Sequence, residues 1–385
     1  MLFLLPTIVS VIPSFVEPAY STTRTRYSEV RFTPAQTGVD PPLLIESDTE
    51  MASLGLPGDG SPGNPYVIEG LNISRVSACI RIANISASFV IRDCFLRASA
   101  GTCLRLTNVS DGRVEDCVLV GAQYAVYCEA SSGVQLSGNT IYDTGHAICI
   151  LDSKFCSISE STIYACFVGI LFQSARNCSC VDNTIYGNTG TGVDISADSL
   201  NNTLAANILG WNSQGILGWG NSIDRGNNNT WSGNFWSDYS PPGPYNLSGS
   251  AGAQDHDPYR LIDNDLPVLD HTDQIVVVEG DETQIVWRTS DQFPLEYRIS
   301  VDGIRQTTGT WTQTEIIYDL RYLAVGEHEV VLNLEDASGL EAFHTVTVRV
   351  LFNILPDIDA GLVVLASIVS IYSVVLVLLA VKTRL

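Results

Sequence analysis

One motif returns three times in this sequence, as NTIYDTGHAICI (139–150), STIYACFVGILF (161–172) and NTIYGNTGTGVDI (183–195). The three copies start 22 residues apart, since 161 − 139 and 183 − 161 both equal 22. Inside each copy, short runs alternate apolar and polar residues, which is the period of a β-strand rather than that of a helix. A fixed period of this length is typical of a solenoid made of repeated coils.

The repeat extends on both sides of these copies. Aligned on apolar-x-x-(Asn/Cys/Ser)-x-apolar, its fourth position holds Cys94, Cys117, Asn139, Ser161, Asn183, Asn207 and Asn234. One coil cannot bury its own apolar face, whereas stacked coils bury a continuous core and pair each strand with its equivalents. The sequence therefore predicts an all-β fold, a right-handed parallel β-helix over residues 55–267. The seven residues are expected to form an inward ladder that hydrogen-bonds the backbone.

The charge of the chain excludes one class of partner. Its 385 residues include 20 Lys and Arg against 42 Asp and Glu, a net charge of −22. Nucleic-acid phosphates are bound by Lys and Arg, so this balance argues against a nucleic-acid partner. A hydrophobic fraction of 45% with 31 Gly is typical of a folded, turn-rich protein.

Both ends of the chain predict contact with a membrane. Residues 1–21 are mostly apolar and end in small residues, as a secretory signal peptide does, with an N-terminal anchor as the alternative. Residues 360–381 carry no charge and are long enough to span a bilayer core of about 30 Å as a single helix. The tail 382–385 is basic and would be cytoplasmic. The remainder would then be a cell-surface ectodomain, beginning with an N-terminal linker at 22–54.

Three stretches resemble a known family: GDGSPGNPYVIEGLNI (58–73), NTWSGNFWSDY (229–239) and DPYRLIDNDLPVL (257–269). They are similar to the first coil, the closing aromatic motif and the following segment of NosD-like right-handed parallel β-helix proteins, which are common on microbial surfaces. The resemblance implies the fold, which hosts lyases, hydrolases, epimerases, adhesins and accessory proteins alike. The NosD name also implies copper delivery, but two Met and five scattered His give a copper site little support.

A second unit is expected at 268–352, where six or seven short alternating runs separated by turn signals predict an antiparallel β-sandwich. The stretch GEHEVVLNLEDASGLEAFHTVTVRV (326–350) resembles the last strands of PKD-like or cadherin-like Ig folds. The unit contains no cysteine, so it lacks an Ig-type disulfide. Its simplest interpretation is a spacer between the solenoid and the membrane.

The cysteines and sequons suggest modifications of an exported chain. All ten Cys lie between residues 79 and 180, and alignment of the coils stacks three pairs that could form disulfides or remain buried free thiols. These pairs are Cys79–Cys103, Cys94–Cys117 and Cys156–Cys178. N-x-S/T sequons that could accept glycans begin at Asn72, Asn84, Asn108, Asn177, Asn201, Asn228 and Asn246.

Three groups of residues are candidates for a functional site. Carboxylates stacked on neighbouring coils could hydrolyse glycosidic bonds or hold Ca²⁺ for a lyase, or could form a solvated polar face. They are Asp93, Asp116, Glu160 and Asp182. A hard-cation site on a loop is suggested more weakly by Asp255, His256 and Asp257. No cofactor is predicted.

The third group is the tyrosine of the repeated motif. Strand alternation turns Tyr142, Tyr164 and Tyr186 outward on three successive coils, beside a row of threonines. Such a strip could be a platform for a sugar chain or could serve only to pack the ladder.

These observations favour a membrane-anchored surface protein whose solenoid presents a non-catalytic binding or spacing face for glycans or partner surfaces. The alternative is a surface carbohydrate-active enzyme, a polysaccharide lyase or glycoside hydrolase of the β-helix type. A metal-maturation accessory role ranks third. The sequence does not determine the ligand or the oligomeric state.

Overall fold

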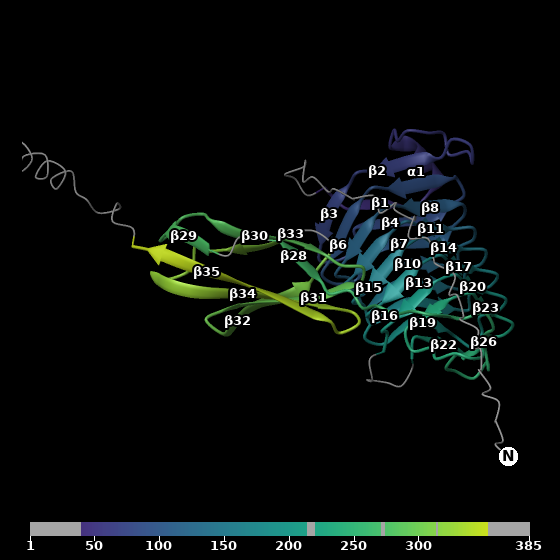
Figure 1. The fold of residues 1–385 in the computed structure, drawn as a ribbon. Helices are drawn as coiled ribbons and strands as arrows, with labels where there is room; N and C mark the ends of the chain where they lie inside the picture. The colour runs from purple at the N-terminus through teal and green to yellow at the C-terminus, as the bar shows by residue number, and fades with distance from the viewer. Residues whose placement is uncertain (1–39, 214–219, 271–273, 313–314, 353–385) are drawn as a thin grey trace, which may run out of the picture. The chain divides into compact units, whose positions relative to one another are not determined.

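The computed structural model describes residues 40–213, 220–270, 274–312 and 315–352 (Figure 1). The chain divides into two units, residues 1–38 and 39–385, and every described residue belongs to the second. The predicted signal peptide (1–21), transmembrane helix (360–381) and tail (382–385) lie outside the described residues. Within the described ranges, no helix has the length and apolar character needed to cross a membrane.

A solenoid of three sheets forms because each coil contributes one short strand to each sheet (Figure 1). These strands pair in parallel, except for the terminal antiparallel pair of Tyr245–Asn246 with Gln254–Asp255. Sheet A orders β1 (Leu43–Ile45), β4 (Ile80–Ile85), β7 (Thr102–Val109), β10 (Tyr124–Glu129), β13 (His146–Leu151), β16 (Val168–Gln173), β19 (Thr191–Ile195) and β22 (Ser222–Asp224).

Sheet B orders β2 (Tyr66–Glu69), β5 (Phe89–Arg92), β8 (Gly112–Glu115), β11 (Gln135–Ser137), β14 (Ser157–Ser159), β17 (Ser179–Val181), β20 (Thr203–Ala205), β23 (Thr230–Ser232), β26 (Gln254–Asp255) and β25 (Tyr245–Asn246). Sheet C orders β3 (Asn72–Arg75), β6 (Phe95–Ala98), β9 (Val118–Val120), β12 (Thr140–Tyr142), β15 (Thr162–Tyr164), β18 (Thr184–Tyr186), β21 (Ile208–Gly210), β24 (Phe235–Trp236) and β27 (Tyr259–Arg260). The prediction of a parallel β-helix is thus confirmed.

The sequence period appears in the structure as strand register. In sheet C, Ile141 pairs with Ile163, and Ile163 pairs with Ile185. Each of these side chains is at most 1% exposed, because the strand turns it into the coil. Equal positions of successive copies therefore stack on one another, which explains why the same residue types recur every 22 residues.

The structure places the seven ladder residues inside the coils, where all are buried. Asn183 shows what the position does: its Oδ1 accepts from the backbone N–H of Ser161 (3.0 Å), and its Nδ2 donates to the carbonyl of Ile158 (2.9 Å). Asn207 and Asn234 repeat the pattern on the following coils. The ladder therefore satisfies backbone groups at a bend where no strand partner is available.

Both ends of the solenoid are closed. At the start, helix α1 (Asp48–Ser53) buries Met51 in the core, and Asp48 accepts from the backbone N–H groups of Ser86 and Ala87. Residues 43–53 were predicted as part of a linker at 22–54, but β1 pairs with β4 and makes them part of the solenoid. At the other end, the fully buried Asp255 accepts from the side chains of Asn234 and Trp236.

The second unit consists of two sheets around one core. The smaller sheet orders β28 (Val268–Asp270), β30 (Gln284–Ser290) and β33 (Glu315–Asp319). The larger orders β29 (Gln274–Val278), β35 (Glu341–Leu351), β34 (Gly326–Asp336), β31 (Pro294–Val301) and β32 (Ile304–Thr310). Trp287 from the first sheet and Leu332 from the second share the buried cluster. One pairing differs from the antiparallel prediction: β29 runs parallel to β35, because the chain passes from β28 in one sheet to the edge of the other.

Candidate functional site

The outer face of sheet A carries a group of aromatic and charged side chains. In β10, Val126 and Cys128 turn inward and are buried, so the alternating positions of Tyr127 and Glu129 face outward and are partly exposed. On the next coil, β13 begins at His146, which pairs in register with Tyr124. The strand geometry thus brings residues of two coils onto one surface.

Four rings on this face contact one another in a row. We call Tyr127, Tyr124, His146 and Phe167 the aromatic cluster. Tyr124 stacks on His146 with ring centroids 5.0 Å apart and an interplanar angle of 21°. Tyr127 meets Tyr124 edge-on at 5.1 Å, and Phe167 meets His146 edge-on at 6.3 Å. Phe167 is 43% exposed. The cluster therefore offers apolar ring surface to a ligand.

Charged groups border the aromatic cluster on both sides. The guanidinium of Arg105 lies 4.9 Å from the ring centroid of Tyr127 and donates to Glu129 at 2.9 Å. A cation over a tyrosine face is attracted by the negative face of the ring. Farther along the stack, Arg225 pairs with Asp194. Hydrogen-bond donors and acceptors thus stand beside apolar rings, the combination found in sites for small polar ligands.

His146 has the most unusual environment in the cluster. Its Nδ1 is buried and has no hydrogen-bond partner within the described part of the chain. Burial lowers the pKa of His146 below its ordinary value, with the charge of Asp194 acting in the opposite direction. The imidazole is therefore neutral at pH 7 and can accept a hydrogen bond or a proton. Burial also raises the pKa of Tyr127, so that phenol remains a donor.

This cluster was not predicted from the sequence, because the five histidines are scattered along the chain. A signal was present: Tyr124 and His146 are 22 residues apart, as are Arg105 and Tyr127, and 22 is the period of the repeat. Residues one period apart must stack. Alignment of the repeats therefore places Arg105 beside Tyr127, and Tyr124 beside His146, on neighbouring coils.

The predicted catalytic carboxylates lie together, but at a corner of the coil rather than on a sheet face. Asp93, Asp116, Glu160 and Asp182 are all exposed, and each has a left-handed backbone with φ between 51° and 57°. Aspartate tolerates this conformation better than most residues because its short side chain bonds locally. The turn therefore favours aspartate at three of these four positions, and catalysis at this corner stays a prediction.

The carboxyl of Asp116 is surrounded by other acidic groups. Desolvation by the neighbouring coils raises its pKa, and the charges of Asp93, Glu115 and Glu160 contribute in the same direction. Gly138 on the next coil leaves room for it, since a Cβ there would lie 2.3 Å from Asp116 Oδ1.

The tyrosines of the motif stack as predicted, but two of them are covered. Tyr142 and Tyr164 have centroids 5.3 Å apart, and Tyr164 and Tyr186 lie 5.1 Å apart with planes only 3° from parallel. Tyr164 and Tyr186 are 2% and 1% exposed, so the expected open strip was wrong for both. The reason is contact with the second unit: Phe293 lies edge-on to Tyr186 at 5.3 Å, and the Tyr186 hydroxyl donates to the Pro294 carbonyl.

The other predicted positions play mainly structural parts. Asp255 accepts five hydrogen bonds and is buried, whereas His256 and Asp257 are exposed, so the three do not converge on an ion. All ten cysteines are buried free thiols in this structure. In the predicted pairs Cys79–Cys103, Cys94–Cys117 and Cys156–Cys178 the two thiols lie close enough to shift each other's pKa, and their oxidation stays a prediction. Of the sequon asparagines, Asn72 is partly buried and the rest are exposed.

Comparison with known families agrees with the solenoid. Residues 78–239 match the family described as "Right handed beta helix region". This part of the chain is therefore a right-handed parallel β-helix. No curated protein matches the sequence.

Several solved structures are similar in fold. An alginate lyase from Paenibacillus sp. str. FPU-7 is 16% identical with a TM-score of 0.38, over 51% of this chain and 76% of that one. The A-module of mannuronan C-5 epimerase AlgE4 from Azotobacter vinelandii is 14% identical with a TM-score of 0.25, over 51% and 75%. Fibronectin(III)-like modules of CbhA from Clostridium thermocellum are 15% identical with a TM-score of 0.19, over 23% and 98%. Likenesses at this level say nothing about a substrate.

Proposed function

We propose that this protein is a NosD-like, membrane-anchored cell-surface protein that binds a glycan on the outer face of sheet A without converting it. The observation that carries the proposal is the aromatic cluster, in which Tyr124, Tyr127, His146 and Phe167 present ring surface beside Arg105 and Glu129. Localisation at the surface rests on the sequence of the two ends, 1–21 and 360–381.

A sugar suits this face for chemical reasons. Its C–H groups pack on aromatic rings, while its hydroxyls exchange hydrogen bonds with groups such as the neutral imidazole of His146 and the guanidinium of Arg105. A chain that runs along the solenoid meets a new coil about every 4.8 Å. The contacts can therefore continue from one coil to the next.

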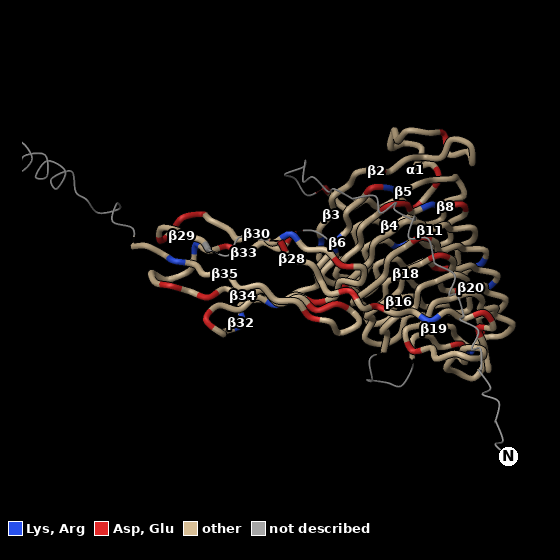
Figure 2. The backbone as a smooth tube through the Cα atoms, viewed as in Figure 1, with Lys and Arg blue, Asp and Glu red and all other residues tan. Residues whose placement is uncertain are grey.

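The charge of the protein favours a neutral glycan. The chain has a net charge of −22, and acidic residues occur along the loops of both the solenoid and the second unit (Figure 2). An acidic polysaccharide would be repelled by this field except close to Arg105 and Arg225. In this proposal the second unit, a PKD-like or Ig-like fold, acts as the spacer that holds the solenoid away from the membrane.

The proposal is tested by retention of the full chain on arrays of neutral and acidic glycans. Replacing Tyr124 and Phe167 together with Ser should reduce retention at least about tenfold, the effect of losing a binding hot spot. Phe155→Ser is the control, because Phe155 is an exposed aromatic residue (58%, against 43% for Phe167) outside the cluster. Equal retention of the double variant and the control would contradict the proposal, as would the absence of any bound glycan.

A second candidate function is favoured by the pairing of Tyr124 with His146. A neutral imidazole stacked on a phenol is a plausible base and acid for cleaving a polysaccharide, and Arg105 could stabilise developing negative charge. Polysaccharides incubated with the full chain would then yield new chain ends, and His146→Gln would abolish their formation. Such turnover would replace the binding proposal with an enzymatic one.

A further inference from the structure

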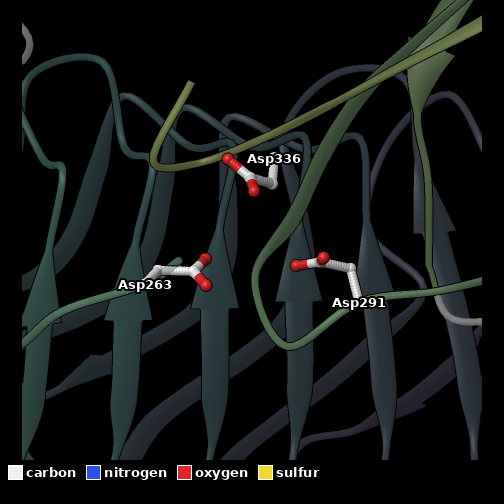
Figure 3. A group of neighbouring side chains, drawn as sticks. All are labelled: Asp263, Asp291 and Asp336. Carbon is white, nitrogen blue, oxygen red and sulfur yellow. The ribbon is translucent and has the colours of Figure 1, made fainter. Parts of the chain in front are cut away.

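Three aspartates from three separate segments converge on one point (Figure 3). Asp263 lies between β27 and β28, Asp291 directly follows β30, and Asp336 ends β34. One carboxylate oxygen from each lies within 4.8 Å of the others. We call these residues the aspartate triad. None of them belongs to a site that the sequence predicted.

Each carboxylate of the triad is held in place by hydrogen bonds from residues close to it in the sequence. Asp263 Oδ1 accepts from the N–H of Asp265 (3.2 Å), and Asp291 Oδ1 accepts from the N–H of Phe293 (2.7 Å). Asp336 Oδ1 accepts from the hydroxyl of Ser338 and the N–H of Leu340. The side chains are therefore positioned before any ligand arrives.

Two oxygens of the triad are buried without a partner. Asp336 is 1% exposed, and its Oδ2 has no hydrogen-bond partner within the described part of the chain. The same is true of Asp263 Oδ2. A buried carboxylate oxygen without a donor is costly, so such an atom in a native fold points to a ligand that the structure does not contain.

The electrostatics of the triad point in the same direction. Burial, together with the nearby carboxylates of Asp336, Asp263 and Asp265, raises the pKa of Asp291 to about 6. Burial likewise raises the pKa of Asp263, and the charge of Asp336 adds to the effect. Like charges this close need either a proton or a cation between them.

We propose that Asp263, Asp291 and Asp336 bind a calcium ion. Only oxygen ligands meet here, and hard cations prefer carboxylates to nitrogen or sulfur ligands. Calcium accepts six to eight oxygens in irregular geometry, so the triad, nearby carbonyls and water can complete its shell. Magnesium demands a more regular octahedron than three loops readily supply.

The ion would fasten the contact that covers the motif tyrosines. Phe293 lies two residues after Asp291, and Ala337 follows Asp336; both belong to the buried cluster that includes Tyr164 and Tyr186. Asp263 lies on the segment that leads out of the solenoid. One ion at the triad therefore connects this segment to the two loops that pack on the solenoid.

The test is calorimetric titration of the full chain with CaCl2 after treatment with EGTA. We expect one ion per chain and a melting temperature that rises when calcium is added, because the ion binds only the folded state. No binding heat together with an unchanged melting temperature would overturn the proposal. Affinity should also fall as the pH is lowered, since protons compete with the ion for the carboxylates.

Variants localise the ion. Asp336→Asn and Asp263→Asn should each weaken calcium binding at least about tenfold, because the charge of the ligands sets the affinity. Asp270→Asn is the control, since Asp270 is an exposed aspartate of β28 outside the triad. Asp263→Asn is included because Asp263 is less deeply buried than Asp336, so its replacement disturbs the fold less. Unchanged tryptophan emission verifies that each variant is folded. If Asp263→Asn and the control bind calcium equally, the ion lies elsewhere and the proposal is wrong.

Discussion

Sheet A and sheet C both carry rings stacked across successive coils, but their surroundings differ. In sheet A, Tyr124 stacks on His146 and the edge-on Phe167 is 43% exposed. In sheet C, Tyr164 stacks on Tyr186 and both are almost fully buried. The same parallel register produced both stacks. An aromatic row in a solenoid therefore indicates strand register first, and it indicates a binding surface only where nothing packs over it.

Substitution on the covered face should have the largest effect. Tyr186→Ala removes a buried ring that packs on Tyr164 and Phe293, and we expect a loss of about 3–5 kcal/mol in the free energy of unfolding. The measurement is a denaturant unfolding curve of the full chain. A loss below about 1 kcal/mol would mean that the two faces do not differ and that Tyr186 is open to solvent in solution.

The next prediction separates the inside of a coil from its outer face. Asn183 lies three residues before Tyr186 but points inward. Asn183→Leu leaves the N–H of Ser161 and the carbonyl of Ile158 without their partner, and we expect a loss of about 1–3 kcal/mol. Thr184→Val, an adjacent and partly exposed position, is the control. An unfolding midpoint equal to that of the control would refute the inward ladder.

On the open face the same chemical change should have little structural effect. We expect Tyr124→Ala to lower stability by about 0.2–1 kcal/mol, the contribution of one cross-strand pair, because its ring is partly solvated. Tyr124→Ala and Tyr186→Ala are measured under identical conditions, so the difference between their losses in the free energy of unfolding reports the difference in burial. If both variants lose the same amount, burial is not what distinguishes the two sheets.

The smallest effect concerns the titration of His146. Because burial lowers its pKa, the unfolded chain takes up this proton more readily than the folded chain, so the stability that His146 contributes is lost as the pH falls below about 6.5. His146→Gln should therefore flatten the dependence of the unfolding midpoint on pH between about 5 and 8. An identical slope in both proteins would show that this histidine is fully solvated.

Much of the solenoid could be predicted because its information is local and periodic. The spacing of Asn139, Ser161 and Asn183 gave the coil length, and strand alternation then placed Ile163 inside and Tyr164 outside. The cover over the tyrosines could not be predicted. Pro294, which accepts from the hydroxyl of Tyr186, lies 108 residues away and has no place in the repeat.

The parallel pairing of β29 and the aspartate triad also depend on contacts that no repeat position indicates. Alternation in β29 indicates a strand but not its direction, so its parallel pairing with β35 could not be predicted. The aspartate triad draws on residues 263, 291 and 336, which share no spacing. His146 is the exception, because its column could be calculated from the repeat.

The closed ends of the solenoid also bear on how copies of the protein behave at high concentration. An open terminal coil would offer rows of backbone N–H and C=O groups to a neighbouring molecule, and the spacing of about 4.8 Å could then propagate from copy to copy as it does in a fibril. Here α1 buries Met51 in the core at the first coil, and the strands that end sheets B and C, β25 and β27, are only two residues long. A covering helix and very short edge strands both hinder such templated growth.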